Sequence, residues 1–70
     1  MDVRRLIGRN VQRLRLALDW SQEDLAAEAG VHRTYVSGVE RGVRNPTATI
    51  IAKLAKALGV PPGDLFNPKP

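Results

Sequence analysis

The chain reads SQEDLAAEAGVHRTYVSGVERG between residues 21 and 42, which is the pattern of two short helices joined by a sharp turn. Ser21 precedes Asp24 by three residues, so its hydroxyl can accept a hydrogen bond from the Asp24 amide and start a helix. Gly30 ends that helix, because glycine adopts the left-handed conformation that a sharp turn requires. A second helix is predicted over 32–41.

The predicted helix 32–41 has two chemically different halves. One half carries small, polar or basic residues, namely Arg33, Thr34, Ser37, Gly38 and Arg41. The other half carries the apolar positions, namely Tyr35, Val36 and Val39. This division predicts a helix that packs against a core on one side and presents a narrow polar face on the other.

Further helices are predicted on both sides of this stretch. Apolar side chains recur at helical spacing over 3–18 and 48–58. A last short helix is predicted to begin at Pro61 and Pro62 and to run through Phe66, because proline is favoured in the first turn of a helix. The sequence therefore predicts an all-α domain of five helices over 1–66, followed by a frayed tail at 67–70.

Composition limits the possible functions. The chain has 70 residues, which is enough for one domain, and its 11 Lys and Arg residues exceed its 7 Asp and Glu residues, for a net charge of +4. Most of the bases are arginine, which favours a partner carrying phosphates, although a basic surface that serves only solubility remains an alternative. With one His, one Tyr and no Cys, we expect neither an enzyme nor a metal or cofactor site.

The sequence also indicates where the protein works. No apolar run approaches the roughly 20 residues of a membrane span. The N-terminal segment is too charged for a signal peptide. We therefore expect a cytoplasmic protein with no membrane association, and nothing in the sequence implies a small-molecule ligand.

The stretch 21–42 resembles the helix-turn-helix of the lambda-repressor/Cro-like (Xre-type) DNA-binding family. The resemblance continues in Leu14-Arg15, in Glu40-x-Gly42, in Asn45-Pro46-Thr47 and in LAKALGV at 54–60, so it covers about residues 4–66. Within the family, HRTYVSGVER at 32–41 looks most like the controller proteins of restriction–modification systems, which are small dimeric autoregulators. Small phage-type repressors are the alternative.

The resemblance implies that helix 32–41 enters the major groove of double-stranded DNA. The expected base-reading residues are Arg33, Thr34 and Ser37. Arg33 is the strongest of them, because a guanidinium can bond guanine O6 and N7 together. The alternative for Arg33 is a phosphate contact or a solvated side chain, and for Thr34 and Ser37 it is a phosphate contact. Gly38 is expected to let the DNA approach closely.

Other residues are expected to hold the DNA backbone or the fold. The expected backbone contacts are Gln22, His32, Tyr35, Arg41, Arg44 and Asn45. For Tyr35, packing against the core is an equally open alternative, and His32 is a poor cap on helix 32–41 or a phosphate contact. Arg15 and Glu40 resemble the family's semi-buried ion pair between the first and third helices, a structural role.

A second apolar stripe lies beside the core face of helix 48–58 and predicts a homodimer interface. Its residues are Ile50, Ala57, Val60, Pro61 and Phe66. Together these features predict a dimeric, sequence-specific transcriptional regulator on a palindromic operator. The alternative is an antitoxin-like or protein-interaction module on the same scaffold. RNA binding is disfavoured, because there are too few aromatic residues for base stacking.

Overall fold

Residues 2–68 are described by a computed structural model, in which they form four α-helices and one short 3-10 helix, with no strand. The elements are α1 (Val3–Ala17), α2 (Gln22–Ala29), α3 (Arg33–Glu40), α4 (Ala48–Leu58) and η1 (Pro62–Phe66). The all-α prediction is confirmed. No helix in this part of the chain is both long and apolar enough to cross a bilayer.

The prediction of five helices is confirmed in part, because the last of the five elements is a short 3-10 helix. The Asp64 amide bonds the Pro61 carbonyl at 3.0 Å, and the Asn67 amide bonds the Asp64 carbonyl at 3.3 Å. Both bonds span three residues, which is the 3-10 pattern and is typical of such short segments. This segment is therefore η1 rather than a fifth α-helix.

Local signals place the helix ends close to where the sequence predicts them. Ser21 and Asp24 form a reciprocal capping box, with hydrogen bonds of 3.0 and 2.8 Å. Gly30 and Gly59 end α2 and α4 with φ angles of 70° and 75°. The first helix ends at Ala17, slightly earlier than predicted, and Asp19 then turns the chain with a φ of 63°.

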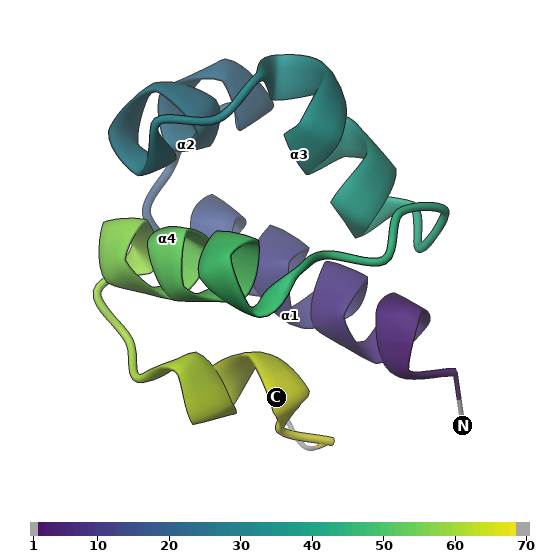
Figure 1. The fold of residues 1–70 in the computed structure, drawn as a ribbon. Coiled ribbons are helices and arrows are strands. Elements are labelled where there is room, and N and C mark those ends of the chain that lie inside the picture. Colours follow the sequence, from purple (N-terminus) through teal and green to yellow (C-terminus); the bar gives the residue numbers. More distant parts are fainter. Residues whose placement is uncertain (1, 69–70) are drawn as a thin grey trace.

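The helices are arranged in layers (Figure 1). α2 and α3 lie on one side, α1 and α4 cross beneath them, and η1 covers the opposite side. All five elements contribute to the core, whose largest fully buried side chains are Ile7, Val11, Leu25, Val36, Val39, Leu54 and Leu65. Burial of each such side chain contributes about 1.5–3 kcal/mol, so the core holds the helix-turn-helix firmly on α1 and α4.

Gly8 allows α1 and α3 to approach closely. A Cβ at this position would lie 2.7 Å from the Glu40 carbonyl oxygen and even closer to that of Val39. The two helices therefore touch through backbone, and any side chain at Gly8 would push α3 away from α1. Nothing in the sequence pattern pointed to this residue.

Asn10 attaches η1 to α1 from within the protein. Its side chain is buried, and Nδ2 donates hydrogen bonds of 2.9 Å to the carbonyls of both Leu65 and Asn67. The segment that packs on α1 thus reaches Asn67, one residue past the boundary expected at Phe66. Residues 69–70 of the expected tail lie outside the described residues.

Candidate nucleic-acid interface

The polar half of α3 faces outward, as its sequence predicts. Arg33 and Thr34 are exposed and Ser37 is half-buried, whereas Val36 and Val39 on the opposite half are fully buried. With eight residues, α3 is about 12 Å long. The outward half carries no large apolar side chain, so it forms a slender polar ridge.

Arg33 lies beside α2. Its Nε is 3.7 Å from Glu23 Oε1, and both side chains are largely exposed, at 62% and 75%. Exposed ion pairs of this kind contribute about 0–1 kcal/mol. The pairing therefore leaves Arg33 free to exchange Glu23 for another anion or for a base edge.

His32 caps α3 with its ring. Its Nδ1 accepts a hydrogen bond of 3.0 Å from the Thr34 amide. A neutral imidazole that accepts at Nδ1 carries its proton at Nε2. His32 therefore satisfies an amide at the start of α3 and still has an exposed N–H to donate.

Arg44 lies against α3, with its side chain beside Gly38 and Tyr35. Its guanidinium carbon is 5.5 Å from the centre of the Tyr35 ring, a cation–π distance. The Val43 and Arg44 amides both donate to the Gly38 carbonyl, at 3.1 and 3.2 Å, which folds the loop back onto the helix. Tyr35 is half-buried and packs against the core, so both alternatives weighed for it remain compatible with its position.

The space beside Gly38 is filled by the chain itself. The three atoms nearest to a Cβ at Gly38 all belong to the Arg44 side chain, including Nε at 3.3 Å. In the unbound chain Arg44 occupies this space, so DNA could reach Gly38 only after Arg44 moved, and the close approach expected there stays a prediction.

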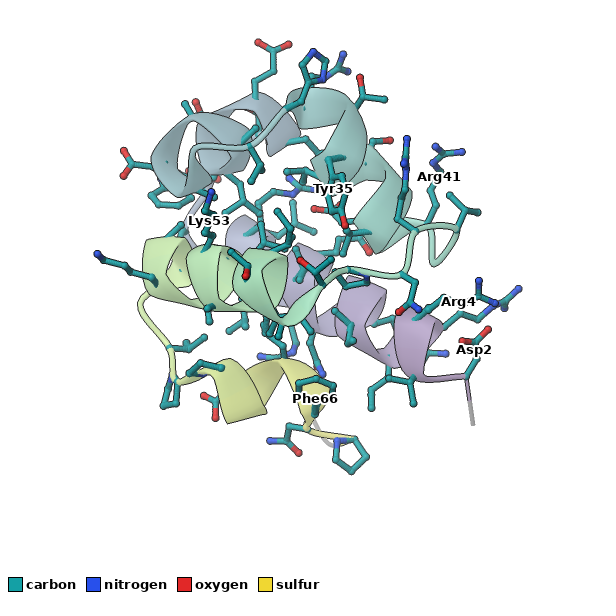
Figure 2. The ribbon with its side chains drawn as sticks, viewed as in Figure 1. Asp2, Arg4, Tyr35, Arg41, Lys53 and Phe66 are labelled. Atoms are coloured by element: carbon teal, nitrogen blue, oxygen red, sulfur yellow. The ribbon has the colours of Figure 1, made fainter. Side chains whose placement is uncertain are left out.

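Further arginines extend the basic surface beyond α3. Arg41 follows α3 and shares a shallow hollow with Arg5 and Arg9 of α1. Figure 2 shows Arg41 and Arg4 projecting from the same side of the molecule. Sequence reasoning missed the arginines of α1, because a charged residue off the apolar face of a helix gives no signal of what lies beside it.

A buried polar network fixes the helix-turn-helix on α1. Arg15 Nε and Nη2 bond the two carboxylate oxygens of Glu40 at 2.7 and 3.0 Å, so the expected ion pair is present and bidentate. Arg15 Nη1 also donates to the Trp20 carbonyl at 2.7 Å. The side chains of the pair are only 9% and 3% exposed, and the hydrogen bonds that Arg15 donates to Glu40 raise the pKa of Arg15 above its ordinary value.

Gln22 joins this network. Its Nε2 donates to Glu40 Oε1 at 3.1 Å, a contact that the sequence did not indicate. The bond holds the Gln22 side chain at the start of α2, beside the end of α3. Because an amide nitrogen carries two protons, one donor remains after the bond to Glu40. Asn45, the last of the expected backbone contacts, is exposed in the loop after α3.

The residues expected at a dimer interface lie on α4 and the segment after it. Ile50, Ala57 and Val60 are half-buried and pack partly against the core of their own chain. Pro61 and Phe66 are exposed, Phe66 by 43%. Phe66 lies on η1, on the side of the molecule away from α2 and α3 (Figure 2). Their role in dimerisation stays a prediction. Within residues 2–68, no cluster of three potential metal ligands is present.

Comparison with known proteins supports the likeness noted in the sequence. The profile of a helix-turn-helix family matches residues 11–65. The control protein C.BamHI of Bacillus amyloliquefaciens is 48% identical over 67 residues, which is 94% of this chain and 83% of that protein. The control protein C.SmaI of Serratia marcescens is 45% identical over 58 residues, or 83% of this chain and 69% of that protein.

Solved structures show the same likeness. The restriction–modification controller protein C.AhdI of Aeromonas hydrophila superposes with a TM-score of 0.87 at 46% identity, covering 90% of this chain and 96% of that one. The controller protein C.Esp1396I, solved as a tetramer with its natural 35 base-pair operator, superposes with a TM-score of 0.85 at 32% identity, covering 94% and 87%. The chain thus belongs to the Xre-type helix-turn-helix family and is similar to its restriction–modification controller proteins.

Proposed function

We propose that this protein is a sequence-specific regulator of transcription that binds a palindromic operator in double-stranded DNA as a homodimer. The observation that carries the proposal is the polar half of α3, which is exposed and slender and is flanked by arginines. A major groove about 12 Å wide admits such a helix. The similarity to controller proteins, one of them solved on its operator, supports the same function.

Arg33, Thr34 and Ser37 are the residues that read bases in this proposal. Arg33 lies in the first turn of α3, where recognition helices contact base edges. Its weak partner Glu23 is displaced when Arg33 bonds a guanine. Thr34 and Ser37 lie on the same half of the helix and contribute hydroxyl groups that can donate or accept.

The DNA backbone is held from both ends of α3. Gln22 donates its second amide proton to a phosphate at the start of α2, and His32 donates from Nε2. Arg41, Arg44 and Asn45 contact phosphates at the far end, with Tyr35 beneath Arg44. These contacts fix the register of the protein on the duplex without reading sequence.

The dimensions of the domain and of DNA support a dimer. The longest extent of the chain is 29 Å, whereas successive half-sites on one face of the duplex lie about 34 Å apart. One chain therefore covers one half-site, and a two-fold partner covers the other. The proposed interface is the partly exposed apolar surface of α4 and the segment after it, which comprises Ile50, Ala57, Val60, Pro61 and Phe66.

Selection from a pool of random DNA duplexes tests this function without knowledge of the operator. We expect the wild-type protein to enrich an inverted repeat with half-sites about one helical turn apart. Arg33→Ala should enrich the same spacing but lose the preference for guanine at one position of each half-site. If the wild-type protein enriches no sequence, the proposed function is wrong, and a module that binds a partner protein becomes the better explanation.

A further inference from the structure

Gly38 lies inside α3, where glycine has no evident backbone reason to be present. Its φ is not positive, whereas the φ angles of Gly30, Gly42 and Gly59 are. Glycine within a helix costs about 0.5–1 kcal/mol relative to alanine. The glycine is explained if a side chain from elsewhere in the protein packs in the space that a Cβ would fill.

Arg44 is the side chain that Gly38 accommodates. The Cγ, Nε and Cδ atoms of Arg44 are the three atoms nearest to the position of a Gly38 Cβ, and the Cγ overlaps that position. The same side chain then extends over the Tyr35 ring, 5.5 Å from its centre. Gly38 below the stem and Tyr35 below the guanidinium thus form a seat for Arg44 on α3.

The seat has an energetic consequence for binding. An exposed arginine has many rotamers, and ordering it on a partner costs about 0.5–1.5 kcal/mol. A guanidinium already stacked on Tyr35 has lost part of that freedom before the DNA arrives. The loop amides of Val43 and Arg44 bond the Gly38 carbonyl, so the backbone that carries the side chain is fixed as well.

We propose that Gly38 is a positioning residue that seats Arg44 against Tyr35 and so pre-organises the Arg44 guanidinium for a DNA phosphate. This inference rests on the proposed function. Alanine at Gly38 displaces the Arg44 stem, and the guanidinium leaves the ring and becomes mobile. Because alanine also favours the helix, the substitution separates loss of binding from loss of stability.

The test compares Gly38→Ala with Arg44→Ala, with the double variant and with Gly63→Ala. Gly63 is the control, because it too lacks a positive φ and a Cβ there has no neighbour within 4 Å. The first readout uses no DNA: the ring current of Tyr35 shifts the Arg44 side-chain proton resonances. We expect that shift to vanish in Gly38→Ala and to persist in Gly63→Ala, with no lower melting temperature in either.

The second readout is affinity for the duplex enriched by the wild-type protein. Gly38→Ala should weaken binding about tenfold. It should also make the negative slope of log affinity against log salt shallower by about one to two, since each dimer loses its two Arg44 contacts. In the Arg44→Ala background, the same substitution should have little further effect.

Three results would overturn the inference. A ring-current shift retained in Gly38→Ala would show that Arg44 stays in place without the glycine. Unchanged affinity and salt slope in Gly38→Ala would show that the seat does not serve binding, while the proposed function would stand. An equal loss with and without Arg44 would show that Gly38 meets the DNA directly. Failure of the wild-type protein to bind any duplex would instead remove the proposed function, and with it this role of the seat.

Discussion

Glu40 accepts hydrogen bonds from two parts of the fold. Arg15 of α1 and Gln22 of α2 both donate to its carboxylate, and its side chain is 3% exposed. A charge this deeply buried is tolerated because its partners satisfy it. The position of α3, and with it the polar half that we propose to read DNA, therefore depends on one carboxylate.

Replacing Glu40 with alanine should destabilise the protein strongly. The change leaves the guanidinium of Arg15 buried without its counter-charge, which costs about 3 kcal/mol. For a domain of this size the melting temperature should fall by roughly 12–24 °C. Glu23→Ala is the matched control, because its exposed pair with Arg33 contributes little. An unchanged melting temperature in Glu40→Ala would contradict this account of the network.

Single residues also show where sequence reasoning stopped. The pair of Arg15 and Glu40 was expected, because the family resemblance carries it. Gly8 and Gly38 were not identified as packing residues, since each matters only because another segment lies against it in three dimensions. The spacing of residues along the chain does not predict that the backbone of Glu40 lies against Gly8, or that the Arg44 side chain folds back over Gly38.

At the scale of the elements, local chemistry predicted most of the fold. The capping box at Ser21, the glycine turns and the apolar periodicity give the helices to within a residue or two. The last element was predicted as helical, but the competition between 3-10 and α geometry in a five-residue segment is not encoded in a local pattern. Its attachment to α1 was also missed, because Asn10 and Leu65 are 55 residues apart in the chain.

Asn10 provides the test of that attachment. Asn10→Ala leaves the buried carbonyl of Leu65 without its donor, which costs about 1–3 kcal/mol. Chemical denaturation should show the loss, and amide hydrogen exchange in 62–67 should accelerate more than in α2. Gln12→Ala, at an exposed position of the same helix, should leave both unchanged. Equal stability of the Asn10 variant and the wild type would mean that η1 is held by its apolar contacts alone.

The whole molecule is proposed to be a dimer, and a charge in the proposed interface should weaken its self-association. Ile50→Glu should place a charge near the two-fold axis opposite its copy, so the dissociation constant should rise at least tenfold. Thr49→Glu adds the same charge at an exposed neighbouring position and should have little effect. Sedimentation equilibrium measures both. A wild-type protein that remains monomeric at high micromolar concentration would contradict the proposed dimer.

The charge distribution predicts how DNA binding responds to salt. About three basic contacts per subunit, in the dimer, release counterions from roughly six phosphates. The slope of log affinity against log salt should then be about −5, which corresponds to a loss of affinity of about a thousandfold between roughly 50 and 200 mM salt. Without Arg44 the slope should become shallower on every sequence, because a phosphate contact does not depend on the bases.

The most direct test of sequence-specific binding is one titration series. Fluorescence anisotropy would compare wild type, Arg33→Ala and Arg44→Ala on the selected duplex and on a scrambled duplex at several salt concentrations. We predict that the wild-type protein prefers the selected duplex. Arg33→Ala should lose about 1–3 kcal/mol of binding free energy on that duplex and little on the scrambled one. Arg44→Ala should weaken binding to both duplexes alike. Equal binding of the wild-type protein to both duplexes at every salt concentration would contradict the account.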